Sequence, residues 1–107
     1  MDGMEQICCE MISYNGAARS AFVEAIQAAK QCEFTQADTL MADGNDKLGQ
    51  GHRVHAGLLQ KEASGESSEI NLLLVHAEDL LMSAETLKIV AEEMVTIHRR
   101  LAAKKDA

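Results

Sequence analysis

The feature that most constrains this chain is a helical periodicity that runs from residue 70 to residue 101. Positions three or four apart are almost all apolar there: Ile70, Leu73, Leu74, Ala77, Leu80, Leu81, Ala84, Leu87, Ala91, Met94, Val95, His98 and Leu101. Residues at this spacing share one face of an α-helix. A long helix with an apolar face needs other elements to cover that face, so the rest of the chain must supply them.

The composition indicates that these other elements are also helices. The chain has 107 residues, no proline and only 3% aromatic residues. Its abundant Ala, Leu, Met, Gln, Glu and Lys are strong helix formers, and clusters of β-branched or aromatic residues are few. A chain of this length forms one domain, which we take as residues 1–107.

Two earlier segments carry the same periodicity. The first covers residues 5–31, and its interior Gly16 marks either a kink or a close contact between helices. The second is predicted to begin at Thr35, with Asp38 three residues on as in a capping box, and to end at the polar stretch 62–68. Three glycines lower its intrinsic helix propensity and leave it dependent on tertiary packing: Gly44, Gly49 and Gly51.

Three helices with short connections predict an all-α, antiparallel three-helix bundle. The third helix, predicted to begin near Ser68, has a second apolar stripe beside its core face: Leu72, Val75, Met82, Val90 and Ile97. A second stripe requires a second partner. Asp79 lies within this stripe, so an oligomer formed along the third helix would bring copies of Asp79 together.

The charge and the cysteine content exclude several classes of function. The formal net charge of −7 argues against binding to nucleic acid or to anionic membranes. The longest apolar run, residues 72–77, already contains His76 and is too short to span a bilayer, and the N-terminus lacks a signal-peptide pattern. An odd number of cysteines fits a reducing compartment, so we expect a cytoplasmic protein with Cys8 and Cys32 in or near the core.

His76 stands in the middle of the third apolar segment, three residues before Asp79. Residues three apart are neighbours on a helix, so these two side chains are predicted to lie side by side. The residues alone leave two interpretations open. His76 is either a structural histidine buried in the helix packing or a reactive imidazole placed where helices meet.

The residues around His76 resemble a known family signature. The run 74–82, Leu-Val-His-Ala-Glu-Asp-Leu-Leu-Met, is similar to that of the lactose/cellobiose-type IIA proteins of the bacterial phosphoenolpyruvate-dependent sugar phosphotransferase system. Further matching pieces occur in the family's order along the chain: residues 16–20, residues 34–37, His52 and residues 62–66. The resemblance therefore covers nearly the whole chain.

The resemblance implies a fold, an activity and a metal. Proteins of this family are three-helix bundles that assemble as homotrimers. The histidine that matches His76 accepts a phosphoryl group from the phosphocarrier HPr and passes it to a cysteine of the IIB component. The relay drives uptake of a lactose-, cellobiose- or chitobiose-type disaccharide through the membrane component IIC. The aspartate that matches Asp79 meets its two copies on the threefold axis, where a metal ion, usually taken as Mg²⁺, neutralises them.

Physical chemistry supports both implied roles. A phosphoryl relay needs a nucleophile that is largely uncharged near pH 7 and forms a labile bond, and imidazole meets both conditions. Three carboxylates brought together in an apolar interface repel one another. A hard divalent cation with oxygen ligands removes that repulsion.

Three positions depart from the family pattern: Glu78 replaces a glutamine, Leu80 a second histidine, and His55 a glutamine. An ionised carboxylate repels a phosphoryl group, so Glu78 either modulates phosphorylation of His76 or turns to solvent. His55 is expected in a packed or interface position, and His52 either lines the cleft of His76 or packs. These departures leave a second function open, a non-catalytic or regulatory interaction module on the same trimeric fold.

Overall fold

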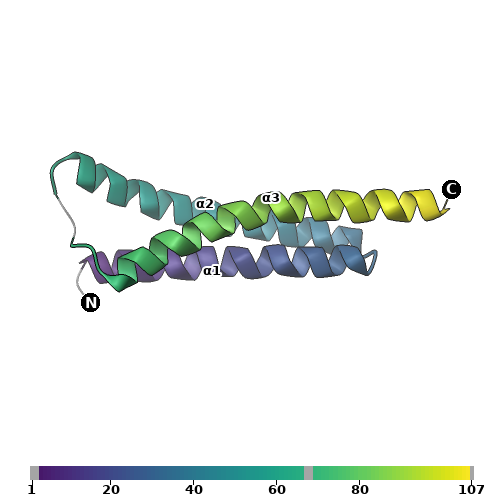
Figure 1. Cartoon of the computed structure of the whole chain (residues 1–107), viewed down its shortest axis with the longest axis horizontal. Coiled ribbons are helices and arrows are strands. Elements are labelled where there is room, and N and C mark those ends of the chain that lie inside the picture. The colour runs from purple at the N-terminus through teal and green to yellow at the C-terminus, as the bar shows by residue number, and fades with distance from the viewer. Residues whose placement is uncertain (1–2, 67–68, 107) are drawn as a thin grey trace.

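The computed structural model describes residues 3–66 and 69–106, and within them it contains three helices and no strand. These are α1 (Gly3–Lys30), α2 (Phe34–Ala63) and α3 (Leu72–Asp106). They form an elongated antiparallel bundle in which α1 and α3 point the same way and α2 runs in the opposite direction (Figure 1). The predicted all-α three-helix bundle is confirmed. None of the described helices carries a stretch apolar enough to cross a bilayer.

Backbone hydrogen bonds hold the turn between α1 and α2. The Cys32 N–H donates to Ala29 O and the Glu33 N–H to Ala28 O, at 3.0 and 2.9 Å, which is the Schellman pattern of a helix end. Cys32 takes the left-handed conformation that this pattern requires, with φ of 61°. It is therefore exposed at a turn, and the expectation that Cys32 lies in or near the core is wrong, while Cys8 is fully buried.

Helix α2 begins one residue before its predicted start, and α3 begins a few residues after its predicted start. Helix α2 begins at Phe34 with Glu33 as its N-cap, so Thr35 lies inside the helix and does not cap it. The turn ends at Glu33, whose carbonyl already accepts the first hydrogen bond of α2 from the Ala37 N–H. Helix α3 begins at Leu72, because the Asn71 side chain caps it by accepting a hydrogen bond from the Leu74 N–H at 3.0 Å. The predicted start at Ser68 lies outside the described residues.

The core is built mainly from alanines and a few large side chains, of which Phe22, Met11 and Leu81 are fully buried. Two of the glycines in α2 mark close approaches to α1. A Cβ added at Gly44 would stand 2.7 Å from Phe22 Cδ1, and one at Gly51 would stand 2.8 Å from Asn15 Cγ. These contacts fix how α2 lies on α1, so the glycines that weaken the helix in isolation strengthen its packing.

The predicted core stripe of α3 is confirmed along its middle and fails at its ends. Its middle residues are buried: Ala77, Leu81, Ala84, Ala91 and Val95. Ile70 is exposed because it precedes the first turn of the helix. Leu101 is exposed because the C-terminal end of α3 projects past the turn that joins α1 and α2 (Figure 1).

Candidate functional site

His76 lies in the second turn of α3 and is exposed, so the interpretation as a buried structural histidine is wrong. It borders an open apolar pocket whose other walls are Leu72 and Leu73. Within residues 3–66 and 69–106, no protein group hydrogen-bonds to the imidazole. Both ring nitrogens are therefore available to a group that approaches from outside the chain.

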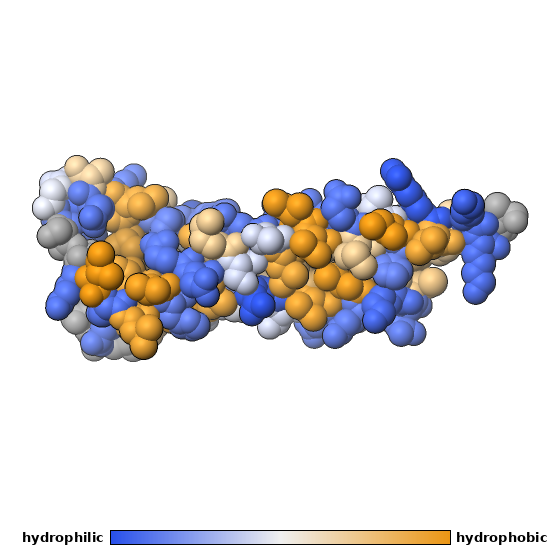
Figure 2. Space-filling model, in the orientation of Figure 1, coloured by the Kyte–Doolittle hydropathy of each residue, from blue (hydrophilic) through white to orange (hydrophobic). Residues whose placement is uncertain are grey.

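Asp79 is exposed one turn beyond His76, among the residues of the second apolar stripe. That stripe is uncovered in the single chain, with Leu72, Val75 and Met82 exposed by 83%, 52% and 60%. Figure 2 shows hydrophobic side chains gathered along the bundle on the face that α3 presents to the viewer. Sequence reasoning missed one member, Ile89, which is 62% exposed and stands seven residues after Met82. The heptad spacing was the signal that could have identified it.

A shallow groove runs between α1 and α3 beside Asp79. It is lined by Arg19 from α1 and by Asp79, Met82, Ser83, Thr86, Leu87 and Val90 from α3. Arg19 is exposed and forms no ion pair with Asp79 in the single chain, although both border the groove. Sequence reasoning did not assign Arg19 a role, and its place within the matching run 16–20 was the signal.

The described residues of one chain do not form a metal site by themselves. No group of three His, Cys, Asp or Glu side chains there could hold an ion. Asp79 is one exposed carboxylate framed by apolar residues, and its oxygens suit a hard cation such as Mg²⁺. The donor set fits the metal only if several copies of the chain each contribute their Asp79.

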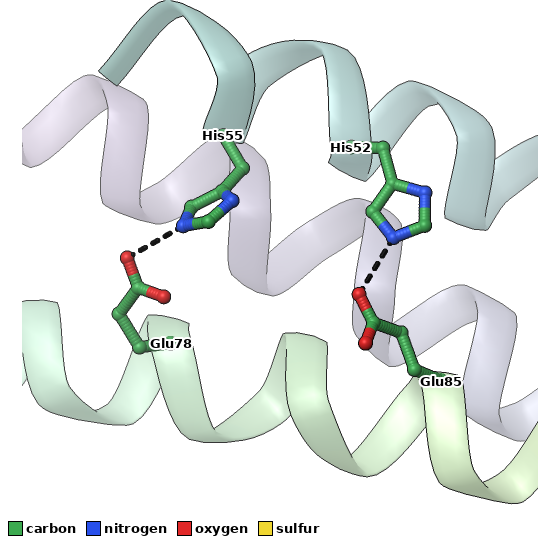
Figure 3. Close-up of polar contacts among 4 residues, drawn as sticks. All are labelled: His52, His55, Glu78 and Glu85. Carbon is green, nitrogen blue, oxygen red and sulfur yellow. Dashed lines mark hydrogen bonds and ion pairs between the residues drawn. The ribbon is translucent and has the colours of Figure 1, made fainter. Parts of the chain in front are cut away.

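Glu78 lies on a different flank of α3 from His76, because two residues correspond to about 200° around a helix. Its Oε1 lies 2.9 Å from His55 Nε2 on α2 (Figure 3). Glu78 is thus held by a hydrogen bond to His55 and does not simply turn to solvent. His55 is in a packed position, as predicted, with its side chain only 19% exposed. Glu78 and His55, two of the three residues that depart from the family pattern, are thus hydrogen-bonded to each other.

A second pair of the same kind lies further along the same interface. His52 Nε2 is 2.7 Å from Glu85 Oε1, and both side chains are substantially exposed (Figure 3). His52 neither packs in the core nor lines the pocket of His76, so both alternatives for it are wrong. The sequence does not reveal these pairs, because each joins residues more than twenty positions apart whose alignment depends on how α2 and α3 pack.

Comparison with protein families and known proteins gives one consistent result. Residues 6–99 match the family described as "PTS system, Lactose/Cellobiose specific IIA subunit". The chain is 38% identical to the lichenan-specific phosphotransferase enzyme IIA component of Bacillus subtilis over 104 residues, which cover 97% of this chain and 94% of the relative. It is 34% identical to the lactose-specific EIIA component of the Staphylococcus aureus PTS over 91 residues, covering 85% and 88%.

A solved structure agrees with the sequence comparisons. The chain superimposes on the crystal structure of the PTS cellobiose-specific enzyme IIA from Bacillus anthracis with a TM-score of 0.95 and 40% sequence identity. The superposition covers 97% of this chain and 95% of that structure. The arrangement of the three helices around His76 is therefore one already seen in an experimental structure.

Proposed function

Because this chain belongs to the lactose/cellobiose-specific IIA subunits of the phosphotransferase system (PTS), and is thus a phosphotransferase component, we propose that it relays phosphoryl groups through His76. HPr is the donor and a cysteine of a IIB component is the acceptor. The observation that carries the proposal is the exposed imidazole of His76 beside an apolar pocket on α3.

The chemistry requires only a nucleophile that another protein can reach. The N–P bond of phosphorylated HPr breaks as a new N–P bond forms on His76, and that bond later breaks as the phosphoryl group passes to a thiolate. Histidine is largely uncharged near pH 7 and provides the lone pair for attack. Leu73, which is not part of the stripe assigned to the trimer, gives a docking protein an apolar contact beside the ring, which would keep water from the labile bond.

We further propose that the chain works as a homotrimer assembled through α3. The exposed stripe supports this, since its large apolar side chains remain uncovered in the single chain. Asp79 would then meet two copies of itself, and Mg²⁺ or a similar divalent ion would be held by one carboxylate from each subunit. Such an ion supplies charge neutralisation at the interface and takes no part in the transfer step.

The names of the relatives support a substrate class. These relatives are named for lichenan, lactose and cellobiose, so we assign this chain to the uptake of a β-linked or lactose-type disaccharide such as lactose, cellobiose or chitobiose. The sugar itself is bound by the membrane component IIC. A relay between HPr and the IIB component also sets the location of the chain, which is the cytoplasm.

The test is labelling with enzyme I, HPr and phosphoenolpyruvate. The parent chain should gain an acid-labile phosphoryl group with HPr present, and His76→Ala should lose it. His98→Gln is the matched control, because His98 also lies on α3 and is only partly exposed. A His76→Ala variant that takes up label as fast as the parent would refute the assignment. A parent chain that stays unlabelled yet binds the IIB component would instead favour the non-catalytic interaction module.

A further inference from the structure

We propose that His52 is a second phosphoryl acceptor, which takes the group on Nδ1 from small donors of the phosphoramidate class. The inference goes beyond the relay through His76, which concerns a different helix and a protein donor. It rests on the His52–Glu85 pair and on Arg53 beside it.

The pair sets the tautomer of His52. A carboxylate can only accept a hydrogen bond, so the 2.7 Å contact to Glu85 places the proton on Nε2. The lone pair of the neutral ring is then on Nδ1. Figure 3 shows that this nitrogen points away from Glu85 and from α3. The His52 side chain is 47% exposed, so a small donor can reach it.

The surroundings favour transfer of an anionic group to this nitrogen. As an N–P bond forms on Nδ1 the ring gains positive charge, and the Glu85 carboxylate at Nε2 stabilises that charge. Arg53 folds back along α2, with a guanidinium nitrogen 3.9 Å from where a Cβ on Gly49 would stand. Arg53 directly follows His52 in the chain, so this stretch of α2 carries one positive charge.

The transfer balances without an oxidant or a metal. The P–N bond of phosphoramidate breaks, ammonia leaves with its electron pair, and the phosphorus forms a bond to Nδ1. The proton on Nε2 passes to solvent by way of the Glu85 carboxylate. The products are ammonia, a proton and a phosphohistidine.

The chain contains its own matched comparison in His55. It makes the same bond to a glutamate, at 2.9 Å, but its side chain is only 19% exposed. If the carboxylate alone caused reactivity, both histidines would react. If reactivity needs an oriented and open Nδ1, only His52 should.

The experiment uses potassium phosphoramidate on the His76→Ala variant, so that no label on His76 interferes and no HPr is needed. Sites are mapped by mass spectrometry, and ring NMR distinguishes Nδ1 from Nε2. We expect phosphate on His52 Nδ1, its loss in His52→Gln, and an unchanged rate at His52 in His55→Gln. Glu85→Gln should slow the reaction about tenfold, as expected for the loss of a charge-assisted hydrogen bond.

Three results would overturn the proposal: no phosphate on His52, equal labelling of His55, or an unchanged rate in Glu85→Gln. Circular dichroism melts of each variant confirm that the bundle is folded. The assay contains no HPr and uses a variant without His76. An absence of label on His52 would therefore say nothing about the relay through His76. Likewise, an absence of HPr-dependent label on His76 would say nothing about the reaction of His52 with phosphoramidate.

Discussion

Adding a methyl group at Gly44 should destabilise the bundle, although alanine is the better helix former. A Cβ at this position would stand 2.7 Å from Phe22 Cδ1 and 3.0 Å from Cζ, and closer still to Cε1. Phe22 is fully buried, so the ring has no free space to move into. We take the overpacking cost as about 2–3 kcal/mol, and the gain in helix propensity as about 1 kcal/mol. The net loss in unfolding free energy for Gly44→Ala is then about 1–2 kcal/mol.

Gly57 is the matched control, because it lies in the same helix, is exposed and has nothing within 4 Å of an added Cβ. Gly57→Ala should therefore stabilise the fold by about 1 kcal/mol. Thermal melts at one fixed protein concentration separate the two, since assembly of the proposed trimer would make Tm depend on concentration. At about 4–8 °C per kcal/mol, Gly44→Ala should melt several degrees below the parent and Gly57→Ala several degrees above it. If Gly44→Ala is as stabilising as Gly57→Ala, the close packing of α2 on α1 is refuted.

Three further substitutions test other parts of the structure. Cys32→Gly should raise the unfolding free energy by about 0.5–1 kcal/mol in urea titrations, because glycine takes the left-handed conformation without strain; a loss of stability would contradict the turn geometry. Asn71→Ala should cost about 1 kcal/mol, because it removes the cap of α3, and an unchanged urea midpoint would show that the cap contributes nothing. If the proposed trimer and its metal exist, Asp79→Leu should keep the trimer in light scattering and abolish binding of the divalent metal. A monomeric variant would instead show that the ion is required for assembly.

The sequence was sufficient to predict the number and direction of the helices, because the periodicity of each segment is independent of its neighbours. The start of α2 was missed for a physical reason. Thr35 and Asp38 have the residue types of a capping box, but the backbone turn centred on Cys32 sets the start first. A left-handed cysteine carries no sequence signal comparable to that of glycine, so the turn could not be anticipated.

The candidate site was predictable only in part. The exposure of the second stripe, with Asp79 inside it, followed from counting positions around α3. The hydrogen bonds of His55 with Glu78 and of His52 with Glu85 could not be predicted, because they depend on the register between α2 and α3. Close contacts such as Gly44 with Phe22 fix the position of α2 on α1, and that position is a property of the folded bundle.

The proposed function requires that this chain both accepts and gives up a phosphoryl group at His76. The most direct measurement is a chase: the chain is phosphorylated by HPr, separated from it, and mixed with its purified IIB component. We expect the acid-labile phosphate to be mapped to His76 before the chase and to appear on a cysteine of the IIB component afterwards. Phosphate that stays on the chain, or that maps to another residue before the chase, would contradict the claim.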